Sequence, residues 1–240
     1  MYHQNQWTPE RFARMIDNTL LAPDAVRSDF EHLCEESRRY GFKMVAVNSA
    51  AIPLCRELLR GSEVAAGAAI SFPLGQCLLR TKLHEVSDSL EAGAQEIDYV
   101  INIGRLKDRD YAYLEQEMRQ ITDLCHQAGT VSKVIFENCY LTGDEMEAMC
   151  KIACEVRPDF IKTSTGFGPG GATVEDVALM KRCVGDRVKI KAAGGIRTLD
   201  GAFALVEAGA ERLGTSRGAA LADELRERLS AKESQHGRGL

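Results

Sequence analysis

A lysine followed at once by hydroxyl side chains and glycines marks the stretch best suited to covalent chemistry. Residues 160–171 read FIKTSTGFGPGG, a pattern typical of a short buried strand that leads into a glycine-rich loop. Inside such a strand Lys162 would lose hydration, and a less hydrated amine releases its proton more easily. The neutral amine can attack a carbonyl carbon to form a Schiff base. We therefore expect a nucleophilic lysine beside a loop whose N–H groups could bind a phosphate.

Two other stretches would direct charged side chains into the same interior. Side chains alternate between the two faces of a strand, so Asp98 and Lys191 face away from their apolar neighbours in residues 96–102 and 187–193. The apolar residues suit the helix-facing side of each strand. The residues expected to point inward are Asp98, Lys162 and Lys191, with Asp17, Lys133 and Glu137 as further candidates.

A buried ion pair is the simpler interpretation of one lysine and one aspartate inside a barrel. Two lysines with an aspartate favour catalysis instead, because a second ammonium repels the first and lowers its pKa. A shift of the lysine pKa from about 10.4 to about 7 corresponds to roughly 5 kcal/mol of bias against the charged form. Desolvation and like-charge repulsion together could supply that bias.

Two later loops have the composition of a phosphate site. Residues 192–198 (AAGGIRT) and 214–218 (GTSRG) each follow a predicted strand, open a helix and contain an arginine. Loops after the seventh and eighth strands of a (βα)8 barrel commonly bind phosphate through glycine amides and helix N-termini. A lone Gly-Gly pair would mark only a turn. The two loops together favour a phosphorylated substrate.

The order of elements predicts a single (βα)8 TIM barrel that spans residues 1–240, with a doubly wound open sheet as the alternative. A short leading helix is expected within residues 1–14, because Thr8-Pro9 resembles a helix N-cap. The polar residues 230–240 are expected to form a flexible tail. The predicted strands are 15–19, 42–48, 66–72, 96–102, 133–138, 160–165, 187–193 and 212–215. The predicted helices are 24–40, 49–60, 77–92, 108–128, 143–156, 173–184, 198–208 and 218–229.

Composition narrows the class of protein. A formal charge of −5 argues against a nucleic-acid partner, which would require a basic surface. No apolar run approaches the roughly 20 residues that span a bilayer, and the first residues do not resemble a signal peptide. The 8 cysteines include no C-x-x-C pair and are read as packing residues in a reducing compartment. We therefore expect a cytoplasmic protein without membrane or nucleic-acid partners.

Metal and nucleotide chemistry have no support in the sequence. The 5 histidines lie at positions 3, 32, 84, 126 and 236, in predicted helices or termini, whereas zinc catalysis would need imidazole ligands at strand ends. Cys150 and Cys154 share a helix face, but they lack two further ligands. Neither G-x-x-x-x-G-K-[ST] nor a G-x-G-x-x-G after the first strand occurs. No metal and no cofactor are expected.

Five stretches together resemble the deoxyribose-phosphate aldolase family, the class I deoxyriboaldolases. The resemblance extends from about residue 16 to residue 218. KTSTGF and K-A-x-G-G-I-R are specific when they occur together at this spacing. The five stretches are IDNTLLAPDA (16–25), FPLG (72–75), EIDYVINIG (96–104), DFIKTSTGF (159–167) and KIKAAGGIR (189–197).

The resemblance implies a barrel that reversibly cleaves 2-deoxy-D-ribose 5-phosphate to acetaldehyde and glyceraldehyde 3-phosphate. It assigns the Schiff base to Lys162, the perturbing second lysine to Lys191, and proton transfer with an ordered water to Asp98. Homo-oligomers also occur in families of this kind. The positions that match its phosphate loops are Gly166, Gly194, Gly195, Arg197, Gly214 and Ser216, and the second-tier site residues are Asp17, Lys133 and Thr165.

The chain departs from the family pattern at Asn18, Ala22, Gln76 and Arg217, and its C-terminal residues contain no tyrosine. These departures leave the aldehyde pair open, so a related class I aldolase or transaldolase acting on another phosphorylated sugar is the nearest alternative. A phosphosugar isomerase, which would need no essential lysine, and a sugar-phosphate-binding module without turnover are the remaining alternatives.

Overall fold

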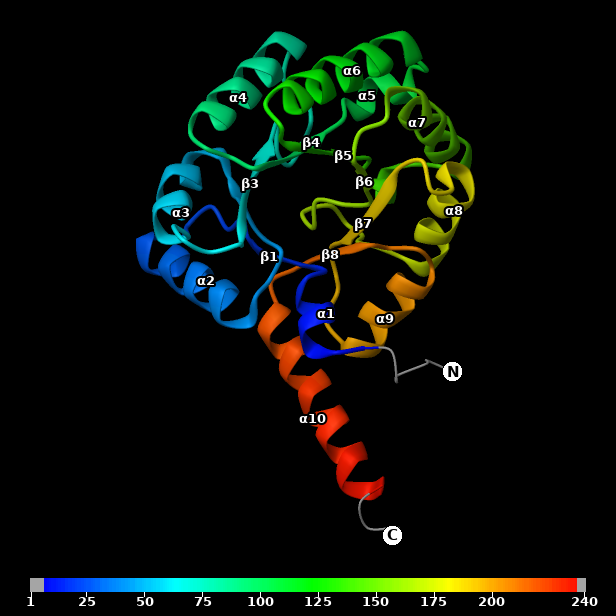
Figure 1. Cartoon of the computed structure of the whole chain (residues 1–240). Coiled ribbons are helices and arrows are strands. Elements are labelled where there is room, and N and C mark those ends of the chain that lie inside the picture. Colours follow the sequence, from blue (N-terminus) through cyan, green and yellow to red (C-terminus); the bar gives the residue numbers. More distant parts are fainter. Residues whose placement is uncertain (1–6, 237–240) are drawn as a thin grey trace.

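A computed structural model describes residues 7–236 and shows a closed parallel barrel surrounded by helices (Figure 1). The strands pair in chain order and β8 returns to β1, so the barrel has no open edge. The predicted (βα)8 fold is confirmed, and the doubly wound alternative is excluded. The strands are β1 (Ile16–Leu20), β2 (Met44–Asn48), β3 (Ala65–Ile70), β4 (Glu96–Val100), β5 (Val131–Ile135), β6 (Phe160–Lys162), β7 (Lys189–Ala193) and β8 (Arg212–Thr215).

Helices follow the strands and cover the outside of the barrel (Figure 1). A short leading helix, α1, precedes β1 as expected. Two 3-10 turns, η2 (Ser49–Ala51) and η3 (Asn138–Tyr140), lie between strands and helices. The helices are α1 (Pro9–Ala13), α2 (Arg27–Tyr40), α3 (Ile52–Leu58), α4 (Leu79–Glu91), α5 (Ile103–Lys107), α6 (Tyr111–Gln127), α7 (Gly143–Val156), α8 (Val174–Val184), α9 (Leu199–Glu207) and α10 (Gly218–His236).

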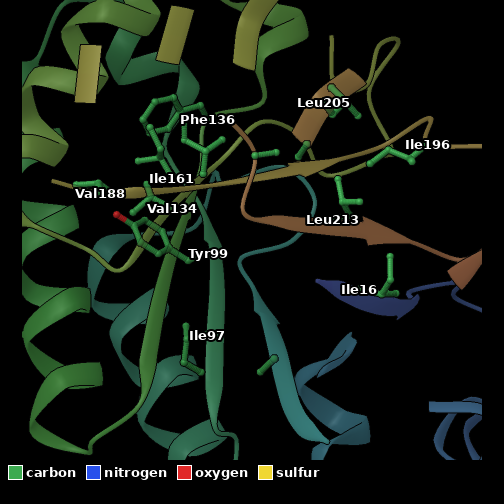
Figure 2. Packing of buried hydrophobic residues seen from close by; sticks show 14 of the residues in the cluster. Ile16, Ile97, Tyr99, Val134, Phe136, Ile161, Val188, Ile196, Leu205 and Leu213 are labelled. Carbon is green, nitrogen blue, oxygen red and sulfur yellow. The ribbon is translucent and has the colours of Figure 1, made fainter. Parts of the chain in front are cut away.

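The hydrophobic core lies between the strands and the helices. Outward-facing strand residues are fully buried there, and Figure 2 shows side chains of this layer, among them Tyr99, Val134 and Ile161. Because this layer takes the apolar face of each strand, the opposite face carries the residues that fill the barrel. Strand alternation therefore leads directly to the charged interior described below.

Local sequence signals fix where the helices begin and end. Thr8, Thr142, Thr173 and Thr198 each accept a hydrogen bond from a backbone N–H in the first turn of the helix that follows. The glycines that follow helices have positive φ, from 59° at Gly185 to 121° at Gly209, and the others among them are Gly41, Gly93 and Gly129. These caps set where the helices begin and end, while the parallel pairing of all eight strands brings their carboxyl ends to one rim.

Every strand except β8 begins or ends one to three residues away from its predicted bounds, and the largest differences are at β5 and β6. β5 runs from Val131 to Ile135 instead of over 133–138, because Glu137 adopts a left-handed backbone conformation (φ 59°) and η3 follows. β6 ends at Lys162 instead of residue 165, so the hydroxyl residues after Lys162 leave the ladder although they stay buried. Both differences shape the rim of the barrel.

Two further predictions were wrong in part. The helix expected over residues 108–128 begins only at Tyr111; Arg109 has a φ of 58°, and α5, which the pattern did not predict, precedes it. The helix expected to end at residue 229 continues as α10 to His236, because no glycine or proline occurs between residues 219 and 236. The flexibility expected of residues 230–240 stays a prediction. Residues 1–6 and 237–240 lie outside the described part.

Candidate functional site

The carboxylate of Asp98 on β4 binds three lysines inside the barrel. Lys162 Nζ donates to Oδ2 at 2.9 Å, and Lys191 Nζ donates to the same oxygen at 2.7 Å. Lys133 Nζ donates to Oδ1 at 2.7 Å. Lys162 and Lys191 are register partners on the neighbouring strands β6 and β7, which brings their amines to one carboxylate.

A second tier of charges lies behind these three lysines. Lys191 Nζ lies 2.5 Å from Asp17 Oδ2, and Lys133 Nζ lies 2.5 Å from Glu96 Oε2. Arg212 on β8 links the two carboxylates: its Nε donates to Asp17 Oδ1 at 2.8 Å, and its Nη2 lies 3.1 Å from Glu96 Oε2. All of these side chains are buried.

The contacts make a closed ring of alternating charge. Following the ion pairs from Asp98 leads to Lys133, Glu96, Arg212, Asp17, Lys191 and back to Asp98. Within the ring, each member contacts two other members of opposite charge. Lys162 stands outside the ring and is attached to it through Asp98.

The pKa of Lys162 is shifted in the opposite direction from the pKa of Lys133. Burial lowers the pKa of the Lys162 amine to about 8; the Asp98 carboxylate opposes this shift, and the Lys191 ammonium adds to it. Burial also opposes charge on Lys133, but the carboxylates of Asp98 and Glu96 outweigh it and raise the Lys133 pKa. Lys162 is therefore suited to nucleophilic attack, whereas Lys133 stays an ammonium.

Asp98 itself remains a carboxylate. Burial favours its protonated form, but Lys133, Lys162 and Lys191 outweigh burial and hold the pKa of Asp98 well below its usual range. An ionised carboxylate accepts protons instead of donating them. Asp98 can thus accept hydrogen bonds from the Lys162 amine and from a bound water or hydroxyl.

A cavity of about 500 Å³ opens above Lys162 at the carboxyl ends of the strands. Its walls come from the loops after β1, β6, β7 and β8. Every position expected from the phosphate loops lies in this lining, as do Thr165 and Lys162. The remaining lining residues are Thr19, Leu20, Leu21, Ala22, Pro23, Phe167, Ala193, Ile196, Thr215 and Arg217.

The cavity has a cationic, amide-rich side and an apolar side. Arg197 and Arg217 stand on the loops that open α9 and α10, and both side chains are exposed. Helix N-termini and exposed guanidinium groups attract anions. Leu20, Leu21 and Phe167 supply apolar surface to the same cavity. The arrangement suits a molecule with an anionic end and a carbonyl that reaches Lys162.

Glycines allow the loops after β6 and β7 to touch. A Cβ on Gly171 would lie 2.3 Å from the carbonyl oxygen of Gly194, and Gly194 has a φ of 85°. The backbone N–H of Ala172 donates to the carbonyl oxygens of Ala193 and Gly194, both at 3.1 Å. Larger side chains would separate the two loops that form this side of the cavity.

Glu137 holds the loop that follows Lys162. The carboxylate of Glu137 is buried, and it accepts hydrogen bonds from the Thr165 hydroxyl and from the Thr165 N–H, the latter at 3.1 Å. Thr165 Oγ1 in turn accepts the N–H of Phe167 at 3.0 Å. This chain of contacts fixes the first turn of the loop that lines the cavity.

The departures from the family pattern differ in their relation to the cavity. Asn18 points outward and donates to Glu36 and Ser37 on α2. Ala22 and Arg217 line the cavity, whereas Gln76 does not. Of the four departures, Ala22 and Arg217 are therefore the ones placed to affect a bound molecule.

Two members of the ring, Glu96 and Arg212, were not expected from the sequence. Strand alternation contained a signal for both, because Glu96 lies two residues before Asp98 and Arg212 lies two residues before Gly214. The other inward-facing candidates, Asp17 and Lys133, lie in the ring, while Glu137 lies at the rim.

Neither a metal site nor a membrane span is found in the described part. Among residues 7–236, no group of three or more His, Cys, Asp or Glu side chains is placed to hold a metal ion. No helix within the same residues is both long and apolar enough to cross a bilayer.

Comparison with known proteins agrees with the geometry. The model of the DeoC/LacD family of aldolases matches residues 12–222. A deoxyribose-phosphate aldolase of Lactobacillus acidophilus is 52% identical over 224 residues, covering 93% of this chain and 94% of that protein. Another from Bacteroides thetaiotaomicron is 48% identical over 218 residues, covering 91% and 92%.

Solved structures show the same likeness. The tetrameric deoxyribose phosphate aldolase from Aeropyrum pernix superposes with a TM-score of 0.85 at 30% identity, covering 91% of this chain and 92% of that one.

Proposed function

The chain belongs to the DeoC/LacD family of aldolases, and from this premise we propose that Lys162 is its Schiff-base nucleophile, assisted by Asp98 and Lys191. The protein is a lyase that reversibly cleaves 2-deoxy-D-ribose 5-phosphate to acetaldehyde and D-glyceraldehyde 3-phosphate through a lysine Schiff base. The observation that carries the residue assignment is the buried amine of Lys162 at the floor of the cavity.

Cleavage begins when the neutral Lys162 amine attacks C1 of the open-chain sugar. Loss of water from the carbinolamine leaves an iminium, which accepts the electron pair of the C2–C3 bond as that bond breaks. The C3 hydroxyl loses its proton and becomes the carbonyl of glyceraldehyde 3-phosphate. The enamine that remains on Lys162 takes a proton at C2, and water releases acetaldehyde.

Asp98, together with an ordered water, shuttles protons in these steps. Its Oδ2 lies 2.9 Å from Lys162 Nζ, within reach of protons on the amine or on a water beside it. Lys191 shares that oxygen at 2.7 Å, so its ammonium both repels a charge on Lys162 and stabilises the carboxylate.

The loops after β6, β7 and β8 bind the phosphate in this proposal. Their glycine amides and Ser216 supply donors, and Arg197 supplies a full positive charge. Thr165 and its partner Glu137 shape the first of these loops.

The reaction is tested by measuring acetaldehyde released from deoxyribose 5-phosphate and from a panel of other phosphorylated sugars. The proposal expects the highest kcat/KM with deoxyribose 5-phosphate. A clear preference for another sugar would favour a different aldolase of the family. Binding without release of an aldehyde from any sugar at any pH would contradict the function.

We also propose that the protein is one domain, acts as a homo-oligomer and resides in the cytoplasm. The tetrameric relative from Aeropyrum pernix supports assembly. The 8 cysteines are all unpaired, which fits a reducing compartment.

A further inference from the structure

Lys162 differs from the three cations of the ring in how many carboxylates it contacts. Lys133 contacts Asp98 and Glu96, Lys191 contacts Asp98 and Asp17, and Arg212 contacts Asp17 and Glu96. Lys162 contacts one carboxylate, Asp98, which the ring already shares between two other cations.

The ring is electrically neutral without Lys162. Within the described residues it joins three cations (Lys133, Lys191 and Arg212) to three carboxylates (Asp17, Glu96 and Asp98). A protonated Lys162 would add one uncompensated positive charge to a buried network, which is costly in a low-dielectric interior.

We propose that Arg212 and Glu96 are positioning residues that set this charge balance and thereby keep Lys162 uncharged for catalysis. Neither residue lines the cavity, so both act through the ring and not on the substrate. Arg212 suits the role because a guanidinium stays charged and its fork-shaped donors can hold two carboxylates at once. The inference deepens the proposed function and rests on it.

Substitution of Glu96 or Arg212 leaves the other charged groups near Lys162 unchanged. Asp98, Lys191 and Lys133 face the Lys162 amine from β4, β7 and β5. Arg197 and Arg217 line the cavity above it. A change at Glu96 or Arg212 therefore alters the charge beneath Lys162 without altering the groups that face it directly.

The test compares the pH dependence of kcat/KM in two variants expected to move it in opposite directions. Arg212→Met removes a cation, so Lys162 should keep its proton up to a higher pH. The acidic limb of the kcat/KM profile should therefore shift by about one pH unit or more to higher pH. Glu96→Gln removes a negative charge with little change of shape, so the limb should shift to lower pH. The double variant restores the balance and should return the limb toward its wild-type position.

Control variants separate charge from structure. Arg212→Lys keeps the charge and should keep the wild-type midpoint, while Arg60→Met removes an exposed arginine and should leave the profile unchanged. If Arg212→Met fails to fold, the Glu96→Gln and Arg212→Lys profiles still decide the question. The inference would be overturned if Glu96→Gln and any folded Arg212→Met lost activity equally at every pH while the midpoints of their kcat/KM profiles stayed in place.

Failure of this inference differs from failure of the proposed function. A wild-type enzyme that forms a lysine adduct, with midpoints that do not respond to Glu96 or Arg212, overturns only the charge-balance role. A wild-type enzyme that forms no lysine adduct with deoxyribose 5-phosphate overturns the function itself.

Discussion

At the scale of the residue, the proposed chemistry depends on the protonation of one amine. Lys162 is 4% exposed, and it has the cavity above it and Asp98 below it. Burial disfavours the ammonium, the nearest carboxylate favours it, and the neighbouring lysine again disfavours it. The resulting pKa of about 8 leaves about a tenth of the amines neutral at pH 7. That fraction is enough for attack on a carbonyl.

The pH dependence of kcat/KM follows from this pKa. Below a pH of about 8 the Lys162 amine is protonated and unreactive, so kcat/KM should fall about tenfold for each unit of decreasing pH. Above that pH the rate should level off. Initial rates of acetaldehyde release between pH 5.5 and about 9.5 check this. A profile that is flat through this range would contradict a titrating nucleophile.

Replacement of the nucleophile gives a second prediction. Lys162→Met keeps an unbranched side chain but removes the amine, and kcat should fall by at least about 10³-fold. Lys151→Met, which changes an exposed lysine on α7, serves as the matched control and should retain wild-type rates. Activity that survives in Lys162→Met and in Lys162→Arg would point to an isomerase, which needs no lysine.

At the scale of the element, six of the eight strands (all but β2 and β3) deliver a charged residue to the interior, and the loops that follow the strands form the rim. β6 contributes Lys162 and then ends, so that the next residues can turn over the cavity. The buried carboxylate of Glu137, which follows β5, holds that turn through Thr165. The positions of nucleophile and loop are therefore coupled across two neighbouring strands.

Glu137→Gln tests this coupling. Loss of the charge-assisted hydrogen bonds to Thr165 should cost about 1.5–3 kcal/mol, which corresponds to a decrease of roughly 10- to 150-fold in kcat/KM. The pH midpoint should stay in place, because Glu137 does not contact the Lys162 amine. Steady-state kinetics across the pH range measure both quantities. A shifted midpoint with unchanged kcat/KM at its plateau would show that the carboxylate acts electrostatically.

The contact between the loops after β6 and β7 gives a fourth prediction. Gly171→Ala would place a Cβ 2.3 Å from the carbonyl oxygen of Gly194 and push the two loops apart. The KM for deoxyribose 5-phosphate should rise by about tenfold or more, since a 1.4 kcal/mol loss of binding is tenfold. Gly143→Ala, at the start of α7, meets no atom closer than 3.9 Å and should leave KM unchanged.

The strands also show which parts of the site could be predicted from the sequence and which could not. Alternation along each strand was sufficient to direct Asp98, Lys162 and Lys191 inward. It did not predict the ring, because Glu96 and Arg212 lie on β4 and β8, and their meeting depends on how the closed barrel aligns distant strands. The break at Arg109 and the turn at Glu137 were missed because a positive φ at a non-glycine residue has no strong sequence signal.

At the scale of the whole molecule, barrel closure makes the site possible. Asp17 on β1 and Arg212 on β8 meet only because the first and last strands pair. Deletion of either end of the barrel would therefore remove part of the ring. α10, by contrast, extends away from the barrel beyond its contact with the other helices (Figure 1).

Truncation and substitution of α10 should have different effects. Leu225 is buried at the base of the helix, and Leu225→Ala should lower the free energy of unfolding by about 2–4 kcal/mol. Removal of residues 232–240 leaves Leu225 in place. It should therefore change the midpoint of thermal unfolding and kcat/KM only slightly. Loss of activity on truncation would assign the end of the chain a part in the reaction.

The central claim is that Lys162 forms a covalent bond with the substrate. Borohydride added together with deoxyribose 5-phosphate reduces the iminium, and mass spectrometry of peptides then locates the adduct. The account predicts modification at Lys162, with a trapping rate that rises with pH toward a midpoint of about 8. An adduct confined to Lys191, Lys133 or a surface lysine, or no adduct with active enzyme, would contradict it.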